Sequence, residues 1–201
     1  MRDLSVKNVE YREVGFAVVD DVADAKTAAM TRELFESSDY DYMVQTRTQH
    51  YSHVFKSNDP ELPGAGEVYS AQFFRSATVE RSELIKNLVE THIRPCVSDV
   101  TKLDCKEDFS LRAYRLDAGD HFRSHVDDYA GSVGFIYYLC TDWKWDWGGI
   151  LHVKVDGQIK SSVPAYNRLV VVNHGLRLPH FVSPIASYAL QPRYMLVGLL
   201  P

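Results

Sequence analysis

A histidine and an aspartate two positions apart, His125 and Asp127, are the residues of this sequence best placed to bind a metal ion. On a β-strand, residues i and i+2 point to the same side, so both side chains can reach one ion. His180 follows a later β-rich segment and precedes a further strand, which makes it the candidate for a third ligand. Two imidazoles and one carboxylate on one side of an ion leave the opposite positions open. The pattern therefore predicts a metal site that can also take small ligands.

Fe(II) is the ion that this ligand set favours, because two imidazoles and one carboxylate with open positions are typical of non-haem iron oxygenases. A structural zinc site would be a closed tetrahedron that usually includes cysteine. Cys96, Cys105 and Cys140 have neither zinc-ribbon nor disulfide-framework spacing, and we expect them to be reduced. A zinc hydrolase stays open as an alternative, because His, Asp and His also hold Zn(II) with an open position.

Short strands in the C-terminal half must hold these ligands. From Phe109 onward the hydrophobic periodicity is that of strands separated by turn signals. The turn signals are Asp117–Asp120, Gly148–Gly149 and Asp156–Gly157. Several short strands at this spacing predict a mainly β fold of the sandwich or barrel type, with flanking helices outside it.

The N-terminal half is predicted to begin with a short strand and a helix. The strand lies within Gly15–Val19, and the helix runs from about Val22 to Ser37 with Asp20 or Asp21 as its cap. The residues expected on the inward face of this helix are Ala25, Ala29, Met30 and Leu34.

The next segment, Ser38 to Gly66, is polar, rich in aromatic residues and without periodicity. We interpret it as a long loop, which is either a substrate lid over the metal or a surface loop with aromatic anchors. A second helix is expected from Val79 to about Val100, where apolar residues recur every three or four positions. Pro95 should kink or end this helix.

Length and composition restrict the class of protein. The chain has 201 residues, of which 45% are hydrophobic and 24% charged, and this favours one soluble domain. A net charge of −5 offers no basic surface for phosphates, so nucleic acid is not an expected partner. No apolar run is long enough for a signal peptide or a membrane span, and we expect a cytoplasmic protein with no membrane association.

Seven segments in order resemble the successive strands of the 2-oxoglutarate/Fe(II)-dependent dioxygenases, and most closely those of the prolyl-4-hydroxylase-like branch. They are Leu111–Arg115, His125–Asp127, Phe135–Leu139, Trp147–Leu151, Asn167–Val171, His180–Pro184 and Arg193–Val197. The resemblance implies a double-stranded β-helix, the jelly roll of cupin-like proteins, in a single domain over residues 1–201. Residues 1–108 would supply the helical support and the lid, and residues 109–201 the core with the metal site.

The resemblance also implies a role for individual residues. His125, Asp127 and His180 would be the catalytic Fe(II) ligands. Arg193 would bind the distal carboxylate of 2-oxoglutarate, since its planar fork can donate two charge-assisted hydrogen bonds to a carboxylate. Arg177 is the fallback for that role. Tyr138 would bind the same carboxylate and Tyr114 would approach the other end of the cosubstrate, although core packing is an equally common role for tyrosines on strands.

The activity implied is hydroxylation of an unactivated C–H bond, with consumption of O2 and release of succinate and CO2, and with ascorbate as a candidate reductant. The prime substrate would be a prolyl or other amino-acid residue of a protein or peptide, or alternatively a free amino acid or metabolite. A non-catalytic jelly-roll binding module is the alternative from another class. The residues expected to touch the prime substrate are Arg123, Tyr129, Arg47 and Tyr51.

Overall fold

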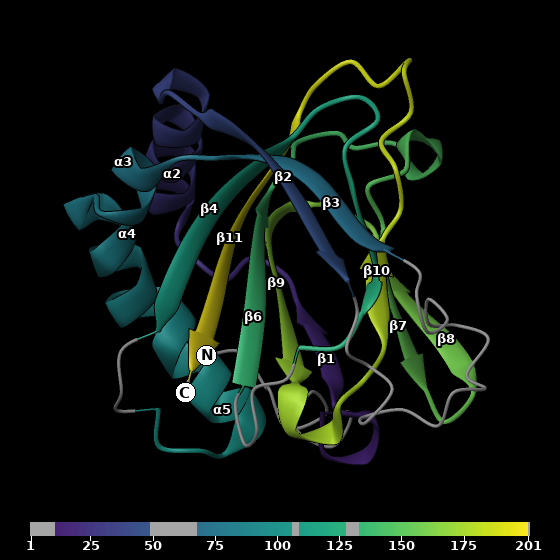
Figure 1. Ribbon diagram of the computed structural model, residues 1–201. Helices are drawn as coiled ribbons and strands as arrows, with labels where there is room; N and C mark the ends of the chain where they lie inside the picture. Colours follow the sequence, from purple (N-terminus) through teal and green to yellow (C-terminus); the bar gives the residue numbers. More distant parts are fainter. Residues whose placement is uncertain (1–10, 49–67, 106–108, 128–132, 201) are drawn as a thin grey trace.

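The computed structural model describes residues 11–48, 68–105, 109–127 and 133–200 (Figure 1). Eleven strands form one sheet in which every pairing of neighbouring strands is antiparallel. The strands are β1 (Phe16–Val19), β2 (Asp41–Thr48), β3 (Val68–Arg75), β4 (Ser110–Leu116), β5 (His121–His125), β6 (Val133–Leu139), β7 (Leu151–Val155), β8 (Gln158–Ser162), β9 (Tyr166–Asn173), β10 (His180–Val182) and β11 (Arg193–Leu200).

The sheet folds back on itself into two layers, and this confirms the predicted jelly-roll core. Its strand order is β1-β9-β6-β11-β4-β3-β5-β10-β7-β8, with β2 paired to β3 outside this path. The strand β3 joins the layers, because Phe74 and Arg75 pair with β4 while Ala71 and Gln72 pair with β5. The layer of β1, β9, β6, β11 and β4 thus faces the layer of β5, β10, β7 and β8 (Figure 1).

Two apolar clusters lie on the two faces of the first layer. Along β6, Phe135, Tyr137 and Leu139 are buried among the helices, whereas Tyr138 belongs to the cluster between the layers. This alternation is the period of two that a strand imposes on its side chains. The helices cover only the outer face (Figure 1), so the inner face of β6, β9 and β11 is left to the site.

The first long helix, α2 (Ala25–Ser37), starts three residues later than the sequence predicted. Its N-cap is Asp24, so the predicted cap by Asp20 or Asp21 is wrong. The inward face was also wrong in part: Ala28, Thr31 and Phe35 are buried and Leu34 is partly buried, whereas the other three predicted residues are exposed, namely Ala25, Ala29 and Met30.

Tertiary hydrogen bonds explain the late start of α2. Val22 donates its amide to the carbonyl of Asn167, and Ala23 exchanges two hydrogen bonds with the Asn167 side chain. These contacts hold both residues in a buried, non-helical segment, so the helix does not include them. Asp20 meanwhile accepts hydrogen bonds from Arg168 instead of capping the helix.

The second predicted helix is present but divided. Its parts are α3 (Ala77–Glu80), α4 (Glu83–Leu88), the π-helical turn η2 (Val89–Ile93) and α5 (Arg94–Thr101), and two short 3-10 helices follow later, η3 (Trp145–Trp147) and η4 (His174–Leu176). Pro95 does not end the helix, because it lies in the first turn of α5, directly after the wider π turn, where a missing amide costs little. None of the helices within the described ranges is long and apolar enough to cross a membrane.

The predicted loop 38–66 is wrong for its first part, since residues 41–48 form strand β2, which pairs residue by residue with β3. Tyr42 and Val44 of β2 are exposed, so β2 has no buried apolar face that the sequence could indicate. Its order comes from main-chain pairing with residues that lie twenty or more positions later. The rest of the predicted lid falls on residues 49–67, which lie outside the described residues.

Candidate metal and cosubstrate site

Main-chain pairing brings the predicted metal ligands together. His125 is the last residue of β5, His180 is the first residue of β10, and the two are directly paired. Asp127 lies two positions beyond the end of β5. One possible ligand atom from each of the three residues lies within 4.8 Å of the other two, and the rings of His125 and His180 are 4.2 Å apart. A single ion can therefore contact all three side chains.

Backbone carbonyls fix which nitrogen of each imidazole faces the aspartate. The Nδ1 atom of His125 lies 2.7 Å from the carbonyl oxygen of Arg123, and Nδ1 of His180 lies 3.0 Å from that of Leu178. A carbonyl can only accept, so each Nδ1 carries the proton and each Nε2 is left with its lone pair. Both Nε2 atoms face Asp127, at 3.8 Å from Oδ1 for His125 and 3.6 Å from Oδ2 for His180.

The protonation of the cluster suits a cation. Burial, with the nearby His180, lowers the pKa of His125 to about 4. Burial also lowers the pKa of His180, but the contact with the Asp127 carboxylate outweighs it, so that pKa ends above its ordinary value. Burial raises the pKa of Asp127, yet the surrounding imidazoles outweigh this and hold it below its usual range. At neutral pH the site holds an ionised carboxylate beside a neutral His125.

A fourth group of the cluster, His174, was missed by the sequence analysis. It lies in η4, and its Nδ1 is 3.5 Å from Oδ2 of Asp127, with 8% of its side chain exposed. Burial lowers its pKa to about 4, so the ring is neutral. No local signal in the sequence identified His174, because it lies outside any motif. Its position depends on the pairing of β9 with β6, in which the preceding residue Asn173 pairs with Val133.

Arg193 is the most deeply buried charged residue among those described, with 0% exposure. Its Nη2 donates to the hydroxyl of Tyr138 at 3.2 Å, its Nη1 lies 2.6 Å from the sulfur of Met195, and its Nε has no partner. The guanidinium also lies over the Tyr138 ring, 4.9 Å from the centroid. In the part of the chain that the structure describes, no carboxylate pairs with Arg193.

The inner face of the first layer connects Arg193 with the metal ligands. Val197 of β11 pairs with Ile136 of β6. Along these strands, both residues lie between the level of the triad and the level of Arg193. These two side chains are only partly buried, whereas Tyr137 and Leu196 on the outer face have 0% exposure. Ile136 and Val197 are thus partly exposed to solvent, although they pack against the buried cluster between the layers.

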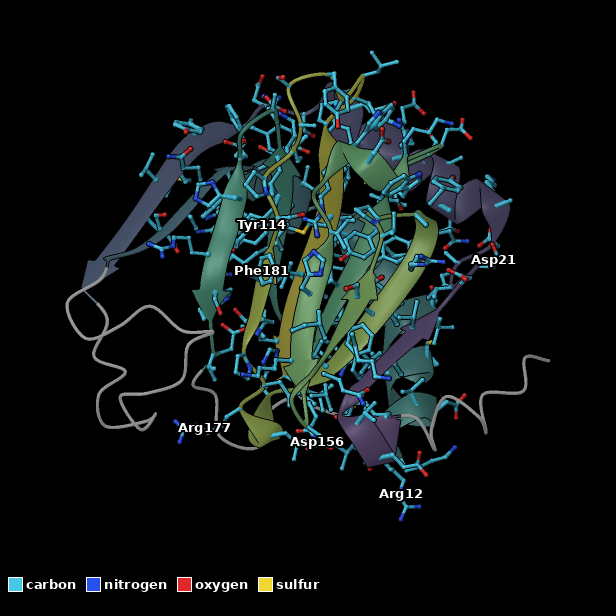
Figure 2. All side chains as sticks on the ribbon, turned by 90° about the vertical axis from the view of Figure 1, so that its right-hand side faces the viewer. Arg12, Asp21, Tyr114, Asp156, Arg177 and Phe181 are labelled. Atoms are coloured by element: carbon cyan, nitrogen blue, oxygen red, sulfur yellow. The ribbon has the colours of Figure 1, made fainter. Side chains whose placement is uncertain are left out.

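Tyr114 lies on this inner face, beside the aromatic residues that lead to the triad. Its ring is 4.8 Å from that of Phe73 and 5.7 Å from that of Phe122, which is 6.5 Å from the ring of His125. Burial, with a contribution from the charge of Asp127, raises the pKa of Tyr114 to about 12, so its hydroxyl is a donor at neutral pH. Figure 2 shows Tyr114 in the body of the molecule.

The other predicted residues are less closely tied to the site. Arg123 is an exposed residue of β5, and Arg47 is on β2, where its side chain is not described. Tyr51 and Tyr129 lie outside the described residues. Arg177, the fallback for Arg193, lies at the periphery after η4 (Figure 2), and does not enter the inner face.

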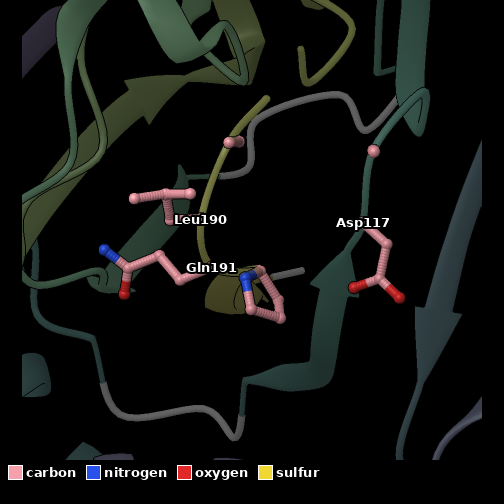
Figure 3. A pocket seen from close by; sticks show the side chains of 6 residues that line it. Asp117, Leu190 and Gln191 are labelled. Carbon is pink, nitrogen blue, oxygen red and sulfur yellow. The ribbon is translucent and has the colours of Figure 1, made fainter. Parts of the chain in front are cut away.

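A separate hollow of about 240 Å³ opens where β11 begins (Figure 3). It is lined by Asp117 and Ala118 from the turn after β4, and by residues 189–192 from the segment before Arg193. None of the predicted site residues lines it. The hollow therefore lies between the turn after β4 and the segment before β11, apart from the metal site.

Comparisons with known proteins agree with this geometry. A family model described as the 2OG-Fe(II) oxygenase superfamily matches residues 109–200. The chain is 27% identical over 127 residues to prolyl 3-hydroxylase OGFOD1 of Mus musculus; the match covers 54% of this chain and 23% of that protein. The chain thus spans about a quarter of the length of this curated relative.

Solved structures share the fold along nearly the whole chain. A prolyl-4-hydroxylase of Pseudomonas putida has a TM-score of 0.63 at 19% identity, covering 98% of this chain and 97% of that one. A Trichoplax adhaerens prolyl hydroxylase in complex with a peptide fragment of the hypoxia inducible factor oxygen degradation domain has a TM-score of 0.64 at 18% identity, covering 98% and 88%. A Burkholderia pseudomallei oxidoreductase of the 2OG-Fe(II) oxygenase family has a TM-score of 0.67 at 17% identity, covering 99% and 91%. Residues 109–200 thus match the model of the 2OG-Fe(II) oxygenase superfamily, and the fold of the chain is similar to that of solved prolyl hydroxylases.

Proposed function

We propose that this protein is a 2-oxoglutarate- and Fe(II)-dependent dioxygenase that hydroxylates an unactivated C–H bond and releases succinate and CO2. The observation that carries the proposal is a pair of features on the facing sides of the two layers. They are an open cluster of two imidazoles and a carboxylate, and a buried arginine that has no acidic partner among the described residues. The cluster suits a metal ion, and the arginine suits a dicarboxylate.

The residues of the cluster fit Fe(II). His125 and His180 each present an unprotonated Nε2 when neutral, and Asp127 is ionised. Each imidazole is oriented by a hydrogen bond from its other nitrogen, as in protein metal sites generally. These three residues would hold the ion. Bound Fe(II), with 2-oxoglutarate and O2, supplies an oxidant strong enough to attack an unactivated C–H bond.

Arg193 fits the distal carboxylate of 2-oxoglutarate. A buried guanidinium without a counter-charge is costly, and a carboxylate that accepts hydrogen bonds from it offsets that cost. Nε of Arg193 lacks a partner, and the hydroxyl of Tyr138, 3.2 Å from Nη2, can donate to the same ligand. Burial raises the pKa of Tyr138 above its ordinary value, so the hydroxyl keeps its proton. Together the two residues orient the cosubstrate.

The apolar residues between these two ends exclude water. Val170, Val172 and Met195 of the inner cluster are almost fully buried, and Ile136 and Val197 line the accessible part of the space. A dry, shaped surrounding confines a reactive oxidant to the bound substrate. Tyr114 would approach the cosubstrate from β4 with a protonated hydroxyl.

For the prime substrate we propose a prolyl or other amino-acid residue of a protein or peptide, with a small amino acid or metabolite as the alternative. Support for a peptide comes from the relatives, which are a prolyl 3-hydroxylase and prolyl hydroxylases, one of them bound to a peptide. Arg123, the exposed middle residue of β5 two positions before His125, would contact that substrate. A cytoplasmic location and ascorbate as reductant stay predictions from the sequence.

Anaerobic titration tests the proposal. Fe(II) and then 2-oxoglutarate are added to metal-free protein, and the weak visible charge-transfer band of the chelate is recorded. The band should appear in the parent and be absent from the Asp127→Ala variant. Bound metal without the band would instead favour a zinc hydrolase or another metal chemistry. A protein that binds neither ligand would favour the binding module.

A further inference from the structure

We propose that His174 is a positioning residue for the metal ligand Asp127. The inference rests on the proposed function, because it concerns the affinity of the metal site. Nδ1 of His174 is 3.5 Å from Oδ2 of Asp127, and this oxygen is also 3.6 Å from Nε2 of His180. An ionised carboxylate only accepts hydrogen bonds, so the proton of the neutral His174 ring belongs on Nδ1.

The surroundings of His174 hold its ring in this orientation. The inner face of Gly134 on β6 carries no side chain, and a Cβ there would collide with Nε2 and Cδ2 of His174. The backbone of His174 is fixed as well, since its carbonyl accepts from the amide of Arg177 in the tight turn of η4. Glycine at 134 therefore makes room for an imidazole that is almost fully buried beside the carboxylate.

The contact adds a restraint to a ligand that lies outside a regular strand. The carboxylate of Asp127 lies beyond the end of β5, and rotation about its Cβ–Cγ bond has only broad preferences. A hydrogen-bond donor beside Oδ2 of Asp127 favours the rotation in which the carboxylate faces the Nε2 atoms of His125 and His180. Partners of this kind around metal ligands typically contribute about 10–100-fold in metal affinity.

Titration of metal-free protein with Co(II), a spectroscopic substitute for Fe(II), tests the role without any turnover. The variants are His174→Ala, which removes the donor, and His174→Asn, whose amide nitrogen replaces Nδ1–H. His152→Ala is the matched control, because that imidazole stacks on Phe181 outside the cluster. Circular dichroism and melting temperature report folding. We expect the Ala variant to bind Co(II) about 10–100-fold more weakly, and the Asn and control variants to bind within a few-fold of the parent.

Equal affinity and equal d–d absorption in the Ala variant would overturn the positioning role. So would an Asn variant that binds as weakly as Ala with an altered d–d band, since His174 would then be a ligand itself. A parent protein that binds no Co(II) would count against the proposed function instead.

A different observation, the register of β4, carries a second inference. Alternation along β4 turns Ala113 to the helices and Arg112, Tyr114 and Leu116 to the inner face. Arg112 pairs with Val197, nearer to the triad than the level of Arg193 and Leu116. Its guanidinium donates to the carbonyl of Leu111, and no carboxylate of the described chain pairs with it.

We infer that Arg112 binds a carboxylate of the prime substrate. This rests on the proposed function, in which Arg193 already serves the cosubstrate. Arg112 is a further cation of the inner face, and its planar fork matches a carboxylate. The substrate class is then an acidic one, such as a free amino acid derivative or a peptide with a free terminal carboxylate.

Matched acids and amides test this class. Fe(II)-loaded parent, Arg112→Gln and the exposed control Arg81→Gln are given 2-oxoglutarate with N-acetyl amino acids and proline dipeptides, each as free acid and as terminal amide. Succinate formation is measured. Free acids should stimulate the parent and the control about tenfold more than amides, and Arg112→Gln should lose this preference, as expected for one charge-assisted contact.

Equal stimulation by acids and amides, or no stimulation by any acid, would overturn the inference. A weaker 2-oxoglutarate chelate in Arg112→Gln would also overturn it, because Arg112 would then belong to the cosubstrate. A parent that forms no chelate at all would count against the proposed function.

Discussion

At the scale of single residues, the site is defined by charges that the protein itself does not neutralise. Arg193 has 0% exposure and no acidic partner among the described residues. Asp127 is ionised and faces the Nε2 atoms of two imidazoles. A buried charge without a partner lowers the stability of the protein unless a ligand neutralises it. A variant can therefore be tested for two quantities, its ligand affinity and its stability without ligand.

Replacing Arg193 with Gln should weaken 2-oxoglutarate binding by about 10–100-fold, because one charge-assisted interaction with a carboxylate is lost. The melting temperature of the ligand-free protein should not fall, since the substitution removes an unpaired buried charge. Chelate absorbance measures the first effect and thermal unfolding the second. Arg177→Gln is the control; a loss of affinity there instead would transfer the role to Arg177.

Metal affinity should depend on pH through His180. Its pKa lies above the ordinary value, and its Nδ1 donates to Leu178, so the extra proton sits on the Nε2 that a metal needs. Protons therefore compete with the metal below that pKa, and affinity should rise with pH and level off above it, with release of one proton. Co(II) titrations across pH measure the slope, and a flat profile through this range would contradict the assignment.

At the scale of elements, a corner at the start of β9 joins the helical layer to the sheet. Asn167 has a φ of +57°, bonds both backbone groups of Ala23, and accepts the hydroxyl of Tyr137. The hydrogen bonds of Asn167 with Val22 and Ala23 explain why α2 begins three residues later than the sequence predicted.

The variant Asn167→Ala should lower the free energy of unfolding by about 3 kcal/mol, because three hydrogen bonds are lost and a left-handed backbone is forced on alanine. Asn167→Gly keeps the backbone conformation and loses only the bonds, so it should be about 1 kcal/mol less destabilised than Ala. Urea unfolding measures both. An alanine variant as stable as the parent would show that the hydrogen bonds of Asn167 do not contribute to the free energy of unfolding.

At the scale of the whole molecule, ligands should bind the two layers together. The proposed metal ligands come from the β5–β10 layer, and the proposed cosubstrate residues from β6 and β11 of the opposite layer. At a concentration of about 100 Kd, a ligand adds about 2.7 kcal/mol, which is a rise of roughly 5–10 °C for a domain of this size.

Thermal unfolding with Co(II), and then with Co(II) and 2-oxoglutarate, should therefore show two successive rises in the parent. Asp127→Ala should show neither rise, and Arg193→Gln only the first. A second rise that persists in Arg193→Gln would place the dicarboxylate elsewhere on the molecule.

The sequence by itself determined the jelly-roll fold, the strands of the C-terminal half and the grouping of His125, Asp127 and His180. Strand parity is local, so a spacing of two residues already places His125 and Asp127 on one side. The order of the strand segments was enough for the resemblance to the family, and the family in turn implied the pairing of distant strands.

Only the tertiary structure decided the contact of His174 with Asp127, the first residue of α2 and the strand β2. Each depends on partners far away in the sequence: β9 on β6, Val22 and Ala23 on Asn167, and β2 on β3. Local spacing sets the side of a strand to which a residue points. Which residues of separate strands meet is set by pairing register and by hydrogen bonds across the fold, and a linear pattern carries no record of these contacts.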